Sequence, residues 1–199
     1  MADIKFGTDG WRAVIAEDFT FANVERVAQA AADYWLANPV DGTEPLIVVG
    51  YDRRFFSDQF ARRVSEILVG NALRVVLTDA PTPTPAVSQA VKDLKAVGGV
   101  MITASHNPPA FNGFKVKAWY GGSADPEICK AIERQLDRSP VKAAEFESAR
   151  RARRIVVKDL RKAHYRAIKK LVDFPLIANS KLKFAHEALY GVGAGCFDE

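Results

Sequence analysis

The pattern of apolar and polar positions in the first half of the chain is typical of alternating helices and strands. Between Thr20 and Ala37, apolar residues recur at spacings of three and four, which predicts an amphipathic helix with Thr20 as its N-cap. A second helix is expected with Ser57 as its cap, and its apolar residues have the same spacing. The predicted buried faces are Val24, Val27, Ala28, Ala31 and Trp35 in the first helix and Phe60, Val64, Ile67 and Leu68 in the second.

Two more helices are marked by a residue with N-capping chemistry that is followed directly by proline. Proline suits the first position of a helix, because its fixed φ is already helical and its missing N–H is not needed there. Thr84-Pro85 predicts a helix that ends near Lys95, and Asp125-Pro126 predicts one that ends near Asp137.

Short, continuous apolar runs lie between these helices. Such runs indicate strands that are covered on both faces of a sheet. Strands that alternate with helices predict a layered α/β domain. The runs are Leu46–Val49, Arg74–Leu77 and Gly98–Thr103.

Apolar periodicity weakens and charge rises between residues 138 and 154, as expected of a domain boundary. We therefore place a first domain at residues 1–153 and a linker strand and helix region at residues 154–180. Residues 181–199 are expected to be the truncated start of a second, similar domain, since they contain too little to form a core of their own.

The elements expected after this boundary are less regular. Ile155–Val157 predicts a strand, and a helix is expected through Tyr165, Ile168, Leu171 and Val172. Lys181–Phe184 predicts a further strand. The glycines from Gly191 to Gly195 suit a phosphate-binding loop, although tight-turn geometry is the commoner reason for such glycines.

Composition and charge exclude several classes of function. The chain has 199 residues, of which 48% are hydrophobic and 26% are charged, with a formal charge of +4. Basic residues gather between Arg150 and Arg154, but no stacking surface or reading motif accompanies them, so we expect no nucleic-acid partner. No membrane span or signal peptide is expected. Cys129 and Cys196 are far apart and form no CxxC pair, which favours the cytoplasm.

Ser105 is the strongest candidate for chemistry, since it follows a buried strand. The carboxyl ends of strands in open α/β sheets are where such folds bind ligands. His106 is adjacent, Lys115 follows, and folding can bring Arg12 near, so the neighbourhood is rich in cations and suits phosphate. The alternative from the residues alone is ordinary turn chemistry, in which Ser105 and Asn107 bind local backbone.

Several stretches, in the same order along the chain, resemble the α-D-phosphohexomutase superfamily, and within it the bacterial phosphoglucomutase/phosphomannomutase branch. The resemblance implies a three-layer α/β/α domain with a mixed sheet, and it implies that the chain is the N-terminal portion of a longer enzyme. The stretch around Ser105 is highly specific to that superfamily. The matching stretches are Phe6–Arg12, Val49–Arg54, Pro83–Pro85, Gly99–Pro108 and Asn112–Lys117.

The resemblance implies an isomerase that acts through a phosphoserine. Ser105 would carry the phosphate and ligate Mg²⁺ through it, so that phosphate moves between C1 and C6 of a hexose by way of a bound hexose 1,6-bisphosphate. The expected ligands are therefore hexose phosphates and that bisphosphate. Because the family's metal-binding aspartates and sugar-recognition loops lie downstream of the matched region, we expect the chain alone to be inactive.

The resemblance also implies roles for three cationic side chains. Lys115 would assist proton transfer, His106 would move or position a proton, and Arg12 would lie near the phosphoserine. Asp52 and Arg54 are expected to form a structural ion pair. Two alternatives stay open for the parent protein: a non-catalytic sugar-phosphate binder, and a phosphoglucosamine mutase.

Overall fold

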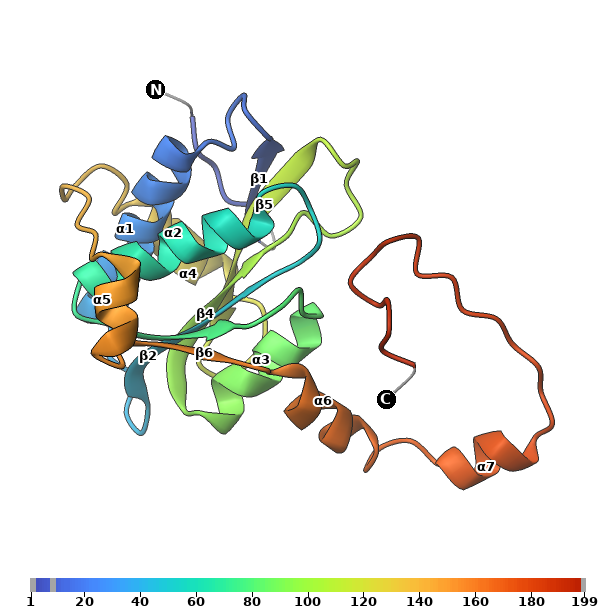
Figure 1. Ribbon diagram of the computed structural model, residues 1–199. Coiled ribbons are helices and arrows are strands. Elements are labelled where there is room, and N and C mark those ends of the chain that lie inside the picture. The colour runs from blue at the N-terminus through green and yellow to red at the C-terminus, as the bar shows by residue number, and fades with distance from the viewer. Residues whose placement is uncertain (1–2, 8–9, 198–199) are drawn as a thin grey trace.

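The computed structural model describes residues 3–7 and 10–197, and six strands of this part of the chain form one mixed sheet (Figure 1). The strand order is β1-β5-β4-β2-β3-β6. The four strands β4, β2, β3 and β6 are parallel, whereas β5 runs antiparallel to both β4 and β1. The strands are β1 (Trp11–Val14), β2 (Glu44–Tyr51), β3 (Arg74–Thr78), β4 (Ala96–Ile102), β5 (Phe111–Ala118) and β6 (Ile155–Lys158).

Helices cover both faces of the sheet, which confirms the expected three-layer α/β/α fold. Figure 1 shows α1, α2, α4 and α5 on one face and α3 and α6 on the other. The helices are α1 (Phe21–Ala37), α2 (Ser57–Gly70), α3 (Thr84–Asp93), α4 (Pro126–Glu133), α5 (Phe146–Arg151), α6 (Arg161–Ile168) and α7 (Phe174–Asn179).

The two helical layers bury opposite sides of the central strand β2. Ile47 and Val49 point into the larger core beneath α1 and α2, whereas Leu46 and Val48 point into the smaller core beneath α3. Successive side chains of a strand alternate between the faces of a sheet, so a strand covered on both sides is apolar throughout. Residues Leu46–Val49 are thus continuously apolar because β2 is covered on both faces, as predicted.

Helix α1 agrees with its sequence pattern in detail. The Thr20 Oγ1 accepts a hydrogen bond from the Asn23 amide at 3.3 Å, so Thr20 is the N-cap. All five residues of the predicted stripe are buried against the sheet. The spacing of apolar residues thus predicted both the position of this helix and the side that it buries.

The predicted cap of α2 is wrong. Phe56, with a left-handed φ of 57°, occupies the cap position, and Ser57 is the first residue of the helix. The Ser57 hydroxyl donates a hydrogen bond to Asp52 at 3.0 Å, so a carboxylate in the preceding loop engages this side chain. Helix α3 likewise begins at Thr84, with Pro83 in the cap position, one residue earlier than predicted.

The region that we interpreted as a boundary packs onto the domain. In α5, Phe146 and Ala149 are buried, and the guanidinium of Arg62 lies 4.1 Å from the centre of the Phe146 ring. Strand β6 pairs with β3 in parallel, so the sheet extends past residue 153. The expected strand at Ile155–Val157 is therefore the edge strand of this sheet. The division of the chain into domains stays a prediction.

Two predictions for the C-terminal segment are wrong. Lys181–Phe184 forms no strand in the structure, and its residues are exposed, because no neighbouring strand is there to pair with them. Helix α6 ends at Ile168, so Leu171 and Val172 lie outside it, and α7 was not predicted. Figure 1 shows residues 181–197 as an extended segment that returns toward the domain. Among the described residues, no helix is long and apolar enough to cross a membrane.

Candidate functional site

Ser105 lies in the loop that follows β4 at the carboxyl end of the parallel strands. Its side chain is exposed, and its φ of 58° places the backbone in the left-handed region. A residue with a Cβ is uncommon there, and such conformations persist only where the surroundings hold them. The loop is therefore shaped by contacts beyond its own preferences.

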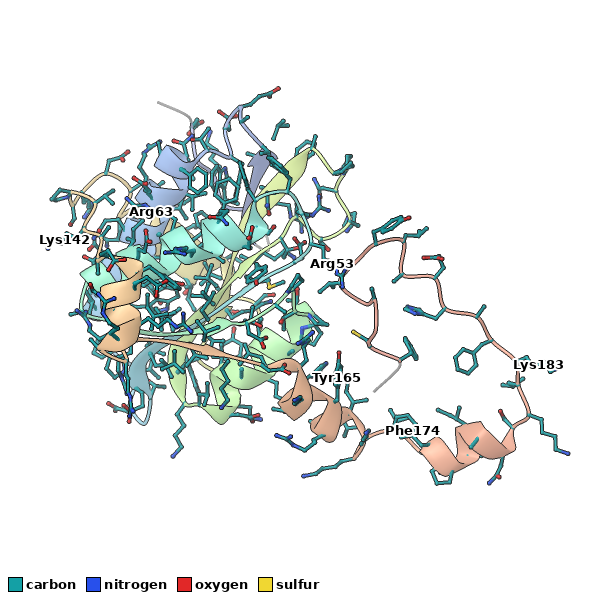
Figure 2. All side chains as sticks on the ribbon, in the orientation of Figure 1. Arg53, Arg63, Lys142, Tyr165, Phe174 and Lys183 are labelled. Atoms are coloured by element: carbon teal, nitrogen blue, oxygen red, sulfur yellow. The ribbon has the colours of Figure 1, made fainter. Side chains whose placement is uncertain are left out.

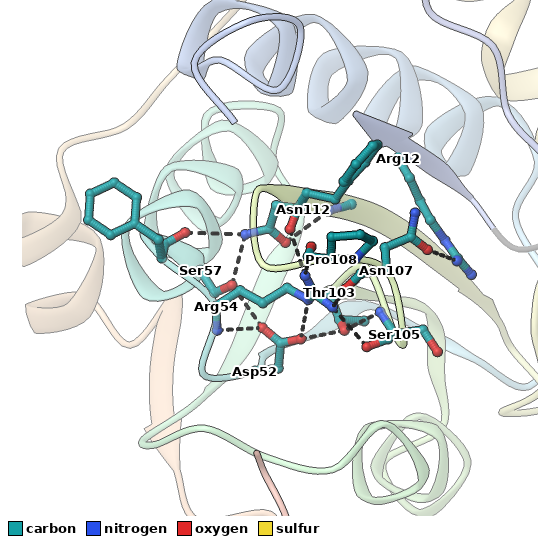
Figure 3. A network of polar contacts seen from close by, with 12 residues as sticks. Arg12, Asp52, Arg54, Ser57, Thr103, Ser105, Asn107, Pro108 and Asn112 are labelled. Atoms are coloured by element: carbon teal, nitrogen blue, oxygen red, sulfur yellow. Dashed lines mark hydrogen bonds and ion pairs between the residues drawn. The ribbon is translucent and has the colours of Figure 1, made fainter. Parts of the chain in front are cut away.

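A chain of hydrogen bonds leads from the Ser105 amide to Asp52 (Figure 3). The Ser105 N–H donates to the Thr103 Oγ1 at 3.0 Å, and the Thr103 hydroxyl donates to the Asp52 Oδ2 at 2.5 Å. The other oxygen of Asp52 accepts the Arg54 amide at 2.9 Å and the Ser57 hydroxyl. Asp52 thus joins the end of β2 to the Ser105 loop.

The Arg54 side chain binds the same loop through main-chain oxygens. Its Nε lies 3.4 Å from the Asp52 Oδ2, so the predicted ion pair between Asp52 and Arg54 is confirmed. Its two terminal nitrogens each donate to two carbonyl groups. The acceptors are Pro108 (2.8 Å) and Phe111 (2.9 Å) for Nη1, and Ser105 (2.9 Å) and Asn107 (2.6 Å) for Nη2.

Arg12 reaches the loop from the opposite side. It lies on β1 opposite Gly113 of β5, and its Nη1 donates to the Asn107 Oδ1 at 2.7 Å. Folding therefore brings Arg12 to the Ser105 loop, where its contact is with Asn107, two residues after Ser105. Within the same motif, Thr8 and Asp9 lie outside the described residues.

Lys115 and His106 differ sharply in exposure. Lys115 lies on β5 opposite Met101 of β4 and is only 5% exposed, so it is no surface lysine. His106 is exposed beside Ser105. The sheet thus brings Lys115 to the strand that leads into the Ser105 loop, while His106 faces solvent.

A cleft of about 800 Å³ opens beside Ser105 and His106. One wall comes from the loop after β2, one from the start of α3, and one from the C-terminal segment that returns toward the domain. Figure 2 shows Arg53 beside this returning segment. Besides Ser105 and His106, the lining consists of Asp52, Arg53, Arg54, Phe55, Pro83, Thr84, Pro85, Met101, Thr103, Asn107, Pro109, Leu189, Tyr190, Gly191 and Val192.

Known proteins are similar to this domain in sequence and in fold. Residues 3–142 match the family model described as phosphoglucomutase/phosphomannomutase, alpha/beta/alpha domain I. The chain belongs to this family. The matched region ends before α5, and it contains Ser105 and every residue that binds the Ser105 loop.

Individual relatives support the same assignment. The chain is 39% identical over 141 residues to a probable phosphoribomutase of Schizosaccharomyces pombe, an alignment that covers 67% of this chain and 24% of that relative. It is 43% identical over 117 residues to a probable phosphomannomutase of Haemophilus influenzae, which covers 54% of this chain and 24% of the relative. The chain thus spans about a quarter of the length of these curated relatives.

A solved structure of a similar protein has the same fold. The crystal structure of a putative phosphomannomutase from Thermus thermophilus superposes with a TM-score of 0.76 at 42% sequence identity. The superposition covers 87% of this chain and 37% of that one. The three-layer domain of this family member is therefore the fold described above.

The described residues do not form a metal site by themselves. No group of three or more His, Cys, Asp or Glu side chains in this part of the chain is arranged to hold a metal ion. Among the described residues that line the cleft, Asp52 is the one carboxylate, and its oxygens already accept hydrogen bonds from Thr103, Arg54 and Ser57. Mg²⁺ prefers six oxygen ligands, so the groups present here do not suffice for it.

Sequence reasoning missed part of the site. Thr103 was given no contact and Asn107 was considered only for bonds to local backbone, yet their side chains connect the Ser105 loop to Asp52 and Arg12. Arg53 and Phe55, which line the cleft, were not singled out. The signal that points to these residues is their position next to Asp52 and Ser105, within or directly after the two matched motifs.

Proposed function

We propose that this chain is the serine-bearing part of a hexose-phosphate mutase and that Ser105 carries the phosphate. The observation that carries the proposal is the position of Ser105, which is exposed at a cleft and lies on a loop braced by two arginines. A phosphoserine brings about two negative charges at neutral pH, which such a loop must accommodate. Membership of the phosphoglucomutase/phosphomannomutase family supports the reaction class.

The reaction consists of two phosphoryl transfers. A hydroxyl of a hexose monophosphate attacks the phosphorus on Ser105, so that a new O–P bond forms, the bond to the serine Oγ breaks, and the hydroxyl proton passes to the departing Oγ. The product is a hexose 1,6-bisphosphate. After it turns over in the cleft, the Ser105 hydroxyl attacks its other phosphate. A bond from phosphorus to the serine Oγ forms, the bond to the sugar oxygen breaks, and the serine proton passes to that oxygen. The phosphoserine is restored, and the hexose keeps the phosphate that it gained in the first transfer.

Three side chains are assigned to this chemistry. Phosphoryl transfer depends mostly on positioning and on stabilisation of charge. Lys115 is proposed for proton transfer, because β5 places it beside the strand that leads to Ser105. His106 is proposed to position or move a proton at the exposed side, and Arg12 to offset phosphate charge next to the loop.

The complete protein is proposed to use Mg²⁺, with a phosphate oxygen on Ser105 as one ligand and the other ligands from outside this chain. The substrates proposed are hexose phosphates and hexose 1,6-bisphosphate. A cytoplasmic location is proposed too, supported by the two free cysteines, Cys129 and Cys196. Two alternatives remain for the complete protein. It could act on phosphoglucosamine instead, or it could be a sugar-phosphate-binding protein without catalytic activity.

The test uses the complete protein and glucose 1,6-bisphosphate labelled in its phosphates. Label is expected on Ser105, located by peptide mass spectrometry, and Ser105→Ala should abolish both labelling and turnover of glucose 1-phosphate. Ser88→Ala, on α3 and outside the cleft lining, is the matched control and should behave as the wild type. Label on another serine, or near-normal turnover by Ser105→Ala, would overturn the proposal. Sugar-phosphate binding without any turnover would favour the non-catalytic class.

A further inference from the structure

We propose that Asp52 and Arg54 are positioning residues, which fix the backbone of Ser105 in its left-handed conformation and so aim its Oγ into the cleft. The inference rests on the proposed role of Ser105 and assigns a function to what is otherwise an ion pair. Neither side chain is proposed to touch the substrate's reacting atoms.

The amide side of Ser105 is held through Thr103. An ionised carboxylate can only accept hydrogen bonds, so the Thr103 hydroxyl must donate to Asp52, and its lone pairs are then available to the Ser105 N–H. The Arg54 amide and the Ser57 hydroxyl fix the Asp52 carboxylate from the other oxygen. This order of donors and acceptors leaves Thr103 with one hydroxyl orientation (Figure 3).

The carbonyl side of Ser105 is held by Arg54. A guanidinium has five N–H donors in a rigid plane, and here four of them meet loop carbonyls while Nε faces Asp52. No donor of Arg54 is left over for a ligand, although the residue lines the cleft. Its geometry therefore suits holding the loop and not binding a phosphate.

The neighbouring Arg53 has the opposite character. It lines the same cleft, and its side chain is exposed. Of these two adjacent arginines after β2, Arg54 binds the Ser105 loop and Arg53 is exposed to solvent. This pair provides a matched control at the same place in the fold.

Holding Ser105 matters because phosphoryl transfer depends on position. A misplacement of the reacting group by about 1 Å can lower the rate about a hundredfold. Lysine keeps the charge of Arg54, but its single ammonium cannot bridge four carbonyl groups. Arg54→Lys should therefore loosen the loop while leaving the charge of the cleft unchanged.

The first measurement is amide hydrogen exchange in the 199-residue chain. Arg54→Lys and Thr103→Val should each speed exchange at Ser105 and Asn107 by at least about tenfold. Thr103→Val removes the acceptor of the Ser105 amide, and Arg54→Lys removes most of the four hydrogen bonds to carbonyl groups around the loop. Arg53→Lys should leave these amides unchanged. Exchange in α1 and β2 reports the stability of the whole domain and should stay as in the wild type.

The second measurement is kinetic and uses the complete protein. Arg54→Lys and Asp52→Asn should lower kcat and the rate of Ser105 labelling by about tenfold to a hundredfold, with KM for the sugar phosphate little changed. Guanidinium ions added to Arg54→Ala should recover part of the labelling rate, since they restore the missing planar donor group. Arg74→Lys is the kinetic control, because Arg74 pairs with Glu44 at the amino end of the parallel strands, opposite to the end that Ser105 follows.

The inference is overturned if Arg54→Lys shows the exchange rates and the kcat of the wild type. It is also overturned if Arg54→Lys raises KM at constant kcat, because Arg54 would then be a substrate-binding residue. Should Arg54→Lys fail to fold, Thr103→Val decides by the same two readouts. These results are separable from the proposed function. If Ser105→Ala keeps its activity, the phosphate-carrier role fails, whereas loss of activity in Ser105→Ala with normal Arg54→Lys refutes only the positioning role.

Discussion

Arg12 and Asn107 are 95 residues apart in the chain, yet the Arg12 guanidinium donates to the Asn107 side chain at 2.7 Å. The same asparagine presents its main-chain oxygen to Arg54 at 2.6 Å. One arginine from β1 and one from the loop after β2 thus hold one residue of the Ser105 loop. The contact depends on the pairing of β1 with β5, which carries Arg12 to the edge of the loop.

Arg12→Ala should impair function more than stability. The variant loses one partly buried hydrogen bond, which contributes about 1 kcal/mol to the free energy of unfolding. In the complete protein, kcat should fall about tenfold to a hundredfold, since a cation next to the proposed phosphoserine is removed. Urea unfolding and steady-state kinetics measure the two effects, and Arg12→Lys should recover part of the activity. A large loss of stability with unchanged kcat per folded molecule would contradict this assignment.

Gly10→Ala should disturb the contact between Arg12 and Asn107, because Gly10 directly precedes β1. Gly10 has a φ of +97°, and a Cβ there would overlap the Phe114 carbonyl oxygen, so β1 must shift away from β5. Strain of this kind costs about 1–3 kcal/mol, measurable as a lower urea midpoint. Gly42→Ala is the control, because its φ of +76° is also positive but no atom lies within 4 Å. An equal fall of the urea midpoint in both variants would show that the positive φ alone, and not the overlap with Phe114, causes the loss of stability.

The sequence was sufficient for elements whose own pattern determines them. Helix α1 carries a capping threonine and a full apolar stripe, and β2 is apolar because it is buried on both faces. Strands β1 and β5 were not predicted, because their antiparallel pairing is a tertiary feature that gives no apolar run. The strand predicted at Lys181–Phe184 failed because strand formation needs a neighbouring strand.

The site was predictable in its residues but not in its connections. Ser105 and Arg12 were identified from motifs, and the structure brings Arg12 to Asn107 in the Ser105 loop. Arg54 was expected to pair with Asp52, but four of its five hydrogen-bond donors meet main-chain carbonyls, which any residue type supplies. Contacts with main-chain groups leave no mark on side-chain identity, so only the structure reveals them.

Glu145 should make the α5 region sensitive to acid. Its carboxylate accepts the Ser148 hydrogen bonds and the Glu147 amide at the start of α5, which lowers its pKa from 4.5 to about 2. A pKa lowered in the folded state gives stability that is present above pH 4.5 and is lost as the pH falls toward 2. Glu145→Gln should therefore reduce stability at pH 6 but scarcely at pH 2. Urea unfolding of both proteins across this range measures the difference, and a constant difference at every pH would contradict the prediction.

The segment after α7 should be the first part of the chain that a protease removes. Lys181 and Lys183 are exposed and lie in no helix or strand, so their peptide bonds can enter the active site of trypsin without local unfolding. Lys115 and Lys117, in contrast, are 5% and 4% exposed within β5 and should resist cleavage until the sheet opens. Mass spectrometry of brief trypsin digests should therefore show loss of the C-terminal segment before any internal cut. The trimmed product should keep the urea midpoint of the whole chain, because residues 181–197 contribute nothing to either core. Early cleavage after Lys115 or Lys117 would mean that β5 opens more readily than its burial indicates. A clear fall in the midpoint after trimming would mean that the C-terminal segment supports the sheet.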